Sequence, residues 1–338
     1  MCGRLYMVSM KDIALRCGVS VATVSKALNG QPDIGEGTRA KIEKTAKEMG
    51  YMTNAAARAL KTKRAYNLGI LFADERRSGL SHEYFSSMLE SFKVEAEAHG
   101  YDITFINNVG GRYNSYLQHC LYRGVDGVII ACVDFTDPRV KELIDSSLPL
   151  VTIDHAFDNR LTVVSDNVTG LERLVHYAYK KGHRKIAFLH GEMTAVTKNR
   201  LAGFHRACEE LGLEIPAEYI RQCVYHDPVR CEEATRELLS LENRPTCIIF
   251  PDDFSYIGGL NVLNEYHLRI PEDISAMGYD GIHLAKVMHL TTYSQNVKKI
   301  GQIAAERLIS LIEHPKETTI ERILVAGELL EGRSVKEL

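Results

Sequence analysis

The chain has 338 residues, of which 45% are hydrophobic and 25% are charged. This composition is typical of folded globular domains and excludes a disordered or fibrous chain. No apolar run approaches the roughly 20 residues needed to cross a bilayer. Residues 1–6 lack the apolar core of a signal peptide, so we expect a cytoplasmic protein. The eight cysteines are scattered without metal-ligand spacing, so we expect no disulfide, metal or cofactor.

The net charge of −3 hides an uneven distribution. Residues 1–66 contain 12 Lys and Arg against 5 Asp and Glu, a net charge of +7. The remaining residues contain 29 against 39, a net charge of −10. A basic segment joined to an acidic body indicates that the segment alone contacts a polyanion. A solvated basic helix face is the alternative interpretation.

Three short helices are predicted in the first fifty residues. Ser9 and Ser20 are suitable N-caps for the first two helices, and Gly18 and Gly30 end them. The third helix is expected at about 38–49. Two short helices separated by a tight turn are typical of a helix-turn-helix, although any three-helix bundle can show this pattern.

Several short motifs occur in this segment in a fixed order: Asp12-Ile13-Ala14, Gly18-Val19-Ser20, Ala22-Thr23-Val24-Ser25, Leu28-Asn29-Gly30, Thr38-Arg39 and Gly50-Tyr51. In order and spacing they resemble the DNA-binding domain of the lactose-repressor (LacI/GalR) family of transcriptional regulators. The resemblance implies a helix-turn-helix domain at 1–53 whose second helix enters the major groove. It implies these DNA-binding residues: Val21, Ala22, Thr23, Ser25, Lys26, Asn29 and, just after the domain, Asn54.

The chemistry of the second helix agrees with that implication. Lys26 can donate to N7 and O6 of guanine, while Val21 and Ala22 can contact a thymine methyl group. We expect Thr23 and Ser25 to contact phosphates or to cap the helix rather than to read bases.

Residues 54–66 form the next segment, an alanine-rich stretch too short to be a stable helix by itself. A plain linker is one interpretation. The family resemblance implies a hinge helix instead, with Leu60 inserted into a minor-groove base step. Arg58 and Lys61 would then contact the DNA beside it.

From residue 67 onward the pattern alternates short apolar runs with amphipathic helices. Strands are expected at 68–73, 102–107, 125–131, 149–153, 162–165, 185–190, 219–225, 247–251, 274–279, 291–295 and 321–326. Helices are expected at 84–98, 114–123, 138–146, 168–181, 199–211, 228–241, 253–265 and 297–313. Such alternation predicts parallel sheets covered on both faces, and this length favours two α/β lobes.

Further motifs lie in this second part: Gly182-His183-Arg184-Lys185, Asn199-Arg200-Leu201-Ala202-Gly203-Phe204, Pro271-Glu272-Asp273-Ile274, Gly278-Tyr279-Asp280 and Leu290-Thr291-Thr292. They resemble the effector-binding core of the same family, a fold shared with periplasmic sugar-binding proteins. The resemblance implies a core at 67–338, with lobe 1 at about 67–166 and 292–319 and lobe 2 at about 167–291 and 320–338. It implies these effector-binding residues: Phe85, Asp154, Arg200, Tyr225, Asp252 and Asp280.

Carboxylates with one Arg and an aromatic ring are suited to a sugar, because they pair with hydroxyl groups and cover an apolar ring face. The adjacent pair Asp252-Asp253 would suit a hydroxyl-rich or cationic ligand. The alternative for each of these side chains is a structural role, such as a surface ion pair for Arg200 or a core position for Phe85.

We therefore expect a homodimeric repressor of a carbohydrate operon that binds a palindromic operator and responds to a small sugar. Enzyme motifs such as a P-loop or nucleophile elbow are absent from the sequence, so we expect no catalysis. A solute-binding protein, and a regulator controlled by a protein corepressor or a non-sugar ligand, are the alternatives. The sequence leaves open the identity of the effector and whether it acts as an inducer or a corepressor. It also leaves open the operator sequence and the start codon (Met1, Met7 or Met10).

Overall fold

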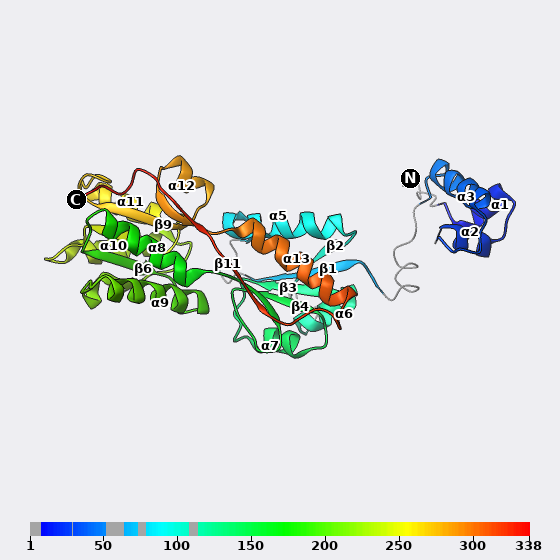
Figure 1. Cartoon of the computed structure of the whole chain (residues 1–338), viewed down its shortest axis with the longest axis horizontal. Coiled ribbons are helices and arrows are strands. Elements are labelled where there is room, and N and C mark those ends of the chain that lie inside the picture. The colour runs from blue at the N-terminus through cyan, green and yellow to red at the C-terminus, as the bar shows by residue number, and fades with distance from the viewer. Residues whose placement is uncertain (1–7, 29, 52–63, 74–78, 108–113) are drawn as a thin grey trace. The chain divides into compact units, whose positions relative to one another are not determined.

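The computed structural model describes residues 8–28, 30–51, 64–73, 79–107 and 114–338. They belong to two compact units, Met1–Ala65 and Tyr66–Leu338 (Figure 1), and each is described by itself. In the part of the chain covered by these ranges, no helix is long and apolar enough to cross a membrane.

The first unit contains three helices, α1 (Met10–Cys17), α2 (Val21–Leu28) and α3 (Glu36–Glu48). Ile13, Val24 and Ile42 supply one fully buried side chain from each helix, and they form the centre of a small core. Because these apolar residues repeat at helical spacing, folding the three helices together buries one side of each. The helix-turn-helix prediction is confirmed.

The capping side chains act as the sequence predicts. Ser9 and Asp12 form a reciprocal capping box at the start of α1, and Ser20 Oγ accepts the backbone N–H of Thr23 at 3.0 Å. By contrast, the N-cap of α3 is Gly35, which has no side chain to cap the helix.

The second unit contains two six-stranded sheets. The first sheet has the order β11-β5-β4-β3-β1-β2 and the second has the order β12-β10-β9-β8-β6-β7. The strands of the first sheet are β1 (Asn67–Phe72), β2 (Asp102–Ile106), β3 (Gly127–Ala131), β4 (Leu150–Ile153), β5 (Leu161–Ser165) and β11 (Arg322–Val325). Those of the second are β6 (Ile186–His190), β7 (Ile220–Gln222), β8 (Cys247–Ile249), β9 (Ser275–Asp280), β10 (Thr291–Ser294) and β12 (Glu328–Leu330). All described pairings are parallel except β10 with β12.

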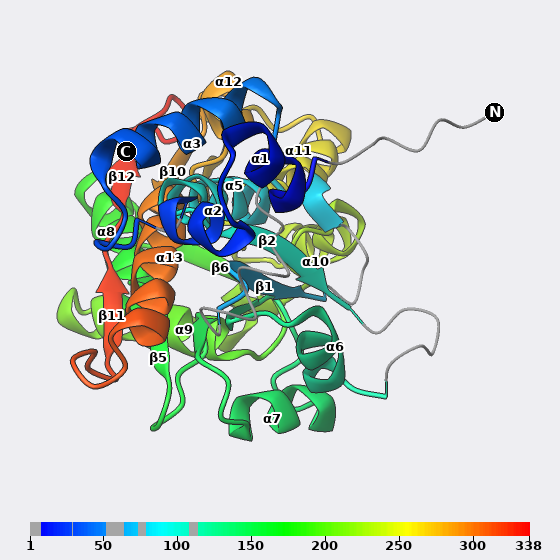
Figure 2. The ribbon, with the colours of Figure 1, turned by 90° about the vertical axis from the view of Figure 1, so that its right-hand side faces the viewer.

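Helices cover both faces of each sheet, as the alternating pattern predicts (Figures 1 and 2). In the first lobe, one face carries α5 (Glu83–Ala98) and α13 (Val297–Glu313), and the other carries α6 (Tyr116–Arg123) and α7 (Pro138–Asp145). In the second lobe, one face carries α8 (Asn167–Lys180) and α9 (Ala195–Glu210), and the other carries α10 (Pro228–Ser240) and α11 (Tyr256–Glu265). Strand β1 shows why both faces are apolar, since Leu68 and Ile70 enter one core and Leu71 enters the other.

The chain passes between the lobes three times, after β5, after β10 and after β11 (Figure 1). The predicted lobe boundaries are therefore wrong at two strands. Strand β10 pairs with β9 and belongs to the second lobe, while β11 pairs with β5 and belongs to the first. Alternation along the sequence predicts strands, but it does not tell which sheet a late strand joins.

A few elements differ from their predicted bounds. Helix α9 begins at Ala195, four residues earlier than expected, because Thr194 caps it through the Thr197 N–H. Strand β7 ends at Gln222 rather than residue 225. The short helix α12 (His283–Val287) and the antiparallel edge strand β12 were not predicted.

Candidate functional site

The outer side of α2 carries the side chains predicted to read DNA. Val21, Ala22 and Lys26 are exposed, whereas Val24 and Ala27 of the same helix are buried in the core. The helix therefore presents two apolar side chains and one cation on the side away from the core. These are groups that can contact base edges in a major groove.

Thr23 and Lys26 have partners inside the unit. Thr23 belongs to the helix cap, because its Oγ1 lies 2.8 Å from Oγ of Ser20. The ammonium group of Lys26 donates to Oδ2 of Asp33, in the turn that leads to α3, and this bond lowers the pKa of Asp33. Ser25 is partly buried on α2. The predicted residues that lie outside the described ranges are Asn29, Asn54, Arg58, Leu60 and Lys61.

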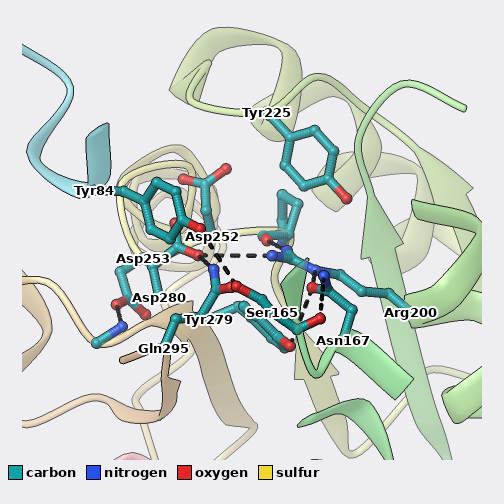
Figure 3. A network of polar contacts seen from close by, with 12 residues as sticks. Tyr84, Ser165, Asn167, Arg200, Tyr225, Asp252, Asp253, Tyr279, Asp280 and Gln295 are labelled. Atoms are coloured by element: carbon teal, nitrogen blue, oxygen red, sulfur yellow. Dashed lines mark hydrogen bonds and ion pairs between the residues drawn. The ribbon is translucent and has the colours of Figure 1, made fainter. Parts of the chain in front are cut away.

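A polar cluster lies in the second unit, where strands of both sheets end (Figure 3). Asp154 follows β4, Ser165 is the last residue of β5, and Asp280 is the last residue of β9. Ligands of open α/β sheets bind beyond the carboxyl ends of the strands, so this is the expected position for a site. The polar cluster consists of Tyr84, Asp154, Ser165, Asn167, Arg200, Tyr279, Asp280 and Gln295.

Arg200 lies at the centre of the polar cluster and is 4% exposed. Its Nε donates to Oδ1 of Asn167 at 2.8 Å, and its Nη1 donates to the carbonyl oxygen of Pro251 at 2.7 Å. Its Cζ lies 3.6 Å from the centroid of the Tyr279 ring. Among the lysines and arginines that the structure describes, Arg200 alone is buried. A buried guanidinium with these partners is fixed in position rather than mobile.

Asp280 joins Arg200 to the second passage between the lobes. Its Oδ1 lies 3.7 Å from Nη2 of Arg200 and accepts a hydrogen bond of 2.6 Å from Nε2 of Gln295. Burial raises the pKa of Asp280 to about 7; the Arg200 charge opposes the rise and Asp252 adds to it. Its φ of 105° is a left-handed conformation rare outside glycine, which is a strain often found at functional sites.

Asp154 lies on the first-lobe side of the polar cluster. Its Oδ1 accepts the backbone N–H of Ser165 at 2.8 Å, and its Oδ2 accepts the hydroxyl of Tyr84 at 3.2 Å. Burial raises the pKa of Asp154, although the bond from Ser165 opposes that rise. Like Asp280, it has a positive φ, of 58°.

Asp252 and Asp253 use their oxygens within the protein. Asp252 accepts the backbone N–H of His226 at 2.8 Å, and it accepts both the N–H and the hydroxyl of Ser255 at 2.7 and 2.8 Å. Asp253 accepts two backbone N–H groups, from residues 281 and 282, and the hydroxyl of Thr292. Burial raises the pKa of Asp253 well above its usual value. These bonds favour a loop-building role and give no support to the expected pair of ligand-facing carboxylates.

The two predicted aromatic residues have different surroundings. Phe85 packs against Phe72 with ring centroids 5.2 Å apart and borders the first-lobe core. Tyr225 lies with its ring against Gly191, where a side chain would collide with it, and its hydroxyl is 2.9 Å from Oγ1 of Thr197. The Tyr225 ring also lies 5.3 Å from Cζ of Arg200, so it borders the polar cluster.

A stack of aromatic rings connects the two lobes. His82, before α5, stacks on His226 with ring centroids 3.9 Å apart and an interplanar angle of 16°. His226 in turn stacks on Phe254, with centroids 4.1 Å apart. A second contact between the lobes is the 2.7 Å bond from the His283 N–H to Oε1 of Glu83. Both contacts join the start of α5 to the second lobe.

A cavity of about 600 Å³ reaches the polar cluster from the side of the crossings between the lobes. Its wall consists of residues 83, 84 and 87 of α5, residues 280–283 and Lys286, residues 294–298, and residues 326–328. Of the predicted effector-binding residues, Asp280 is the one on its wall. Arg200 and Asp154 lie deeper, in the hydrogen-bonded network itself.

The sequence analysis missed several members of the polar cluster. Tyr84 is next to the predicted Phe85, and Tyr279 is next to the predicted Asp280. Asn167 lies two residues after the end of β5 and starts α8, which is the signal that could have identified it. His82 and His226 gave no signal, because a stack of two imidazoles from distant segments has no sequence pattern.

Comparison with known proteins decides the family. Residues 66–329 match the model described as periplasmic binding proteins and sugar binding domain of the LacI family, and residues 9–54 match the model of bacterial regulatory proteins of the lacI family. The chain belongs to the LacI family. It is a DNA-binding transcriptional repressor of this family, and membership confirms that it is not an enzyme.

Relatives match the chain over nearly its whole length. The HTH-type transcriptional repressor PurR of Mannheimia succiniciproducens is 28% identical, covering 98% of this chain and 100% of the relative. The Bacillus subtilis protein named "Probable HTH-type transcriptional repressor ExuR" is 30% identical, covering 98% and 99%.

Solved structures show the same fold. The lac repressor dimer bound to operator and the anti-inducer ONPF superimposes with a TM-score of 0.80 at 23% identity, covering 98% of this chain and 99% of that chain. A transcriptional regulator CelR–cellobiose complex gives a TM-score of 0.71 at 21% identity, covering 97% and 99%. At these sequence identities, the likeness to the two solved structures shows the fold alone.

Proposed function

We propose that this LacI-family repressor binds a palindromic operator as a homodimer and that a small uncharged carbohydrate, bound at the polar cluster between the lobes, controls this binding. The regulated genes are those of a carbohydrate operon. Because operator DNA is the target, the protein works in the cytoplasm.

The observation that carries the effector proposal is the polar cluster itself. Arg200 is held by Asn167 and Pro251, and Asp280 and Asp154 lie on either side of it at the carboxyl ends of the two sheets. Fixed donors and acceptors of both kinds suit a ligand with several hydroxyl groups, since each hydroxyl can donate and accept.

The charges of the polar cluster favour a neutral ligand over an anion. The buried guanidinium of Arg200 already has the carboxyl group of Asp280 as a neighbour. Asp154 adds a carboxylate, and Asp252 raises the pKa of Asp280 from nearby. Burial already drives these carboxyls toward their neutral form, and an added phosphate or carboxylate would raise their pKa values further, which is costly.

The DNA-binding part of the proposal depends on α2. One recognition helix contacts only a few base pairs, and two-fold pairing of subunits doubles the site. Val21 and Ala22 contact thymine methyl groups and Lys26 contacts guanine, while the hinge segment with Leu60 reaches the minor groove at the operator centre.

Two of the contacts described above connect the ligand site to the passages between the lobes. Arg200 holds Asn167, just after β5, and Asp280 holds Gln295, just after β10. A ligand that contacts Arg200 and Asp280 therefore acts on both passages and on the angle between the lobes. It changes operator affinity to the extent that it binds one lobe arrangement better than the other.

The test is a selection of bound duplexes from random DNA, followed by titration of the selected operator in the presence of a ligand panel. The panel contains neutral mono- and disaccharides, uronic acids, sugar phosphates and purine bases. The proposal predicts an enriched palindrome whose affinity changes with a neutral sugar. A response to an anionic ligand alone would contradict the ligand class, and indifference to the whole panel would favour a protein corepressor.

A further inference from the structure

The ion pair between Lys26 and Asp33 involves the single cation on the exposed side of α2 described above. Lys26 is in the last turn of α2, and Asp33 is five residues beyond the end of that helix. Nζ of Lys26 donates to Oδ2 of Asp33, and both side chains are 50% exposed. A pair this exposed contributes little to stability, because water screens it.

The turn that contains Asp33 is held by other bonds. The N–H of Gln31 donates to the carbonyl oxygen of Lys26 at 3.0 Å, and Nη2 of Arg39 donates to the carbonyl oxygen of Gln31 at 2.7 Å. Ile34, next to Asp33, packs against the core of the unit. The backbone of the turn is thus fixed without the carboxylate of Asp33, whose main effect is on Lys26.

A lysine is a poor reader of bases when it is alone. Its ammonium group is a compact charge on a flexible four-carbon chain, and it can reach a phosphate as easily as a guanine. A carboxylate that pairs with the ammonium group limits the positions that this group can take. Because phosphates repel the carboxylate, the paired ammonium group is also kept away from the DNA backbone.

We propose that Asp33 is a positioning residue for base recognition, which holds the ammonium group of Lys26 over the base edges and so sharpens the base preference of the repressor. The inference rests on the proposed role of Lys26 in the major groove. Without Asp33, Lys26 is expected to divide its contacts between guanine and the neighbouring phosphates.

The test is selection from random duplexes with the full-length wild type, Asp33→Asn, Asp33→Glu and Lys26→Ala. We expect Asp33→Asn to lower discrimination by roughly fivefold at one symmetric operator position, the same position that Lys26→Ala affects. Its affinity for unrelated DNA should not fall, because a negative charge has been removed. Asp33→Glu should keep part of the preference.

Glu43→Gln is the matched control, because it removes the same charge from an exposed position on α3. It should leave discrimination at that position unchanged. The double variant Lys26→Ala, Asp33→Asn should select the same sequences as Lys26→Ala alone, since Asp33 acts through Lys26. A merely structural role of Asp33 would instead lower affinity for every sequence and add to the effect of Lys26→Ala.

An unchanged preference in Asp33→Asn, or an equal loss at all operator positions, would overturn this proposal while leaving the repressor function intact. A wild type that enriches no common sequence would overturn both. Circular dichroism of each variant shows whether the helices remain folded.

Discussion

Nη2 of Arg200 lies 3.7 Å from Oδ1 of Asp280. Each of the two side chains is also hydrogen-bonded to a residue in a different one of the segments that cross between the lobes. Arg200 bonds to Asn167 at 2.8 Å and Asp280 bonds to Gln295 at 2.6 Å. The pair is therefore both the charged centre of the candidate ligand site and a connection between two of the three crossings. We propose that a ligand that contacts this pair also changes the relative position of the lobes.

Replacing Asp280 by Asn should alter how stability depends on pH. The pKa of Asp280 is raised from 3.8 to about 7 in the folded protein, so between these values the folded state holds a proton that the unfolded state has released. The contribution of Asp280 to the free energy of unfolding should thus fall as pH rises from about 4 to about 7, by an amount on the order of a few kcal/mol.

Urea unfolding followed by circular dichroism at pH 5 and pH 8 measures this effect. The Asp280→Asn variant should lose less stability over that interval than the wild type. Asp273→Asn is the control, because Arg269 lowers the pKa of that exposed carboxyl and its titration lies below the interval. Equal pH slopes for the wild type and Asp280→Asn would contradict the raised pKa.

His82→Ala tests the ring stack between the lobes. Removing the imidazole takes away its contact with His226, and an aromatic pair of this kind is worth about 0.5–1.5 kcal/mol. Because the stack joins the lobes beside the ligand site, we expect effector affinity to fall severalfold, with operator affinity in the absence of effector unchanged. Isothermal titration calorimetry with the identified sugar measures the affinity for the effector.

His99→Ala is the matched control for that variant, since His99 follows the other end of α5 and is exposed. It should bind the sugar as the wild type does. If both variants bound equally well, the stack would have no part in binding the effector.

Asp252→Ala separates loop building from ligand contact. The substitution leaves the N–H groups of His226 and Ser255 without their acceptor, and each unmet buried group costs about 1–3 kcal/mol. We expect a lower thermal midpoint in the absence of any sugar. A variant of unchanged stability that had lost its sugar response would instead assign Asp252 to the ligand.

Leu60→Ala addresses the hinge, a segment outside the described residues. If Leu60 enters a minor-groove base step, the variant should lose affinity for the operator but keep its affinity for unrelated DNA, which depends on phosphates. Competition binding with both duplexes measures the two quantities. An equal loss of both would show that Leu60 has no wedge role.

The periodic features of the sequence predicted most of the fold. Apolar side chains at helical spacing gave α1–α3, and alternation of apolar runs with amphipathic helices gave the two α/β lobes. The lobe membership of β10 and β11 could not be predicted, because strand pairing depends on contacts between distant segments. Strand β12, with three residues, is too short to show a period.

The candidate site was predictable where a side chain lies at a strand end. Asp154 and Asp280 follow or finish strands, and Arg200 belongs to a recognisable motif. The partners of these residues were not predictable, since Tyr84 and Gln295 reach them from other elements. The sequence also did not reveal that Asp252 bonds to two backbone N–H groups, because such bonds depend on the loop conformation.

The most direct test of the account is the operator affinity of the wild type and of Arg200→Ala, measured in parallel at increasing concentrations of the sugar identified by the panel. The account predicts similar affinities without sugar and a sugar-dependent change in the wild type alone. A variant that keeps the response would remove Arg200 from the ligand site. Loss of operator binding in the variant without sugar would contradict the separation of the two sites.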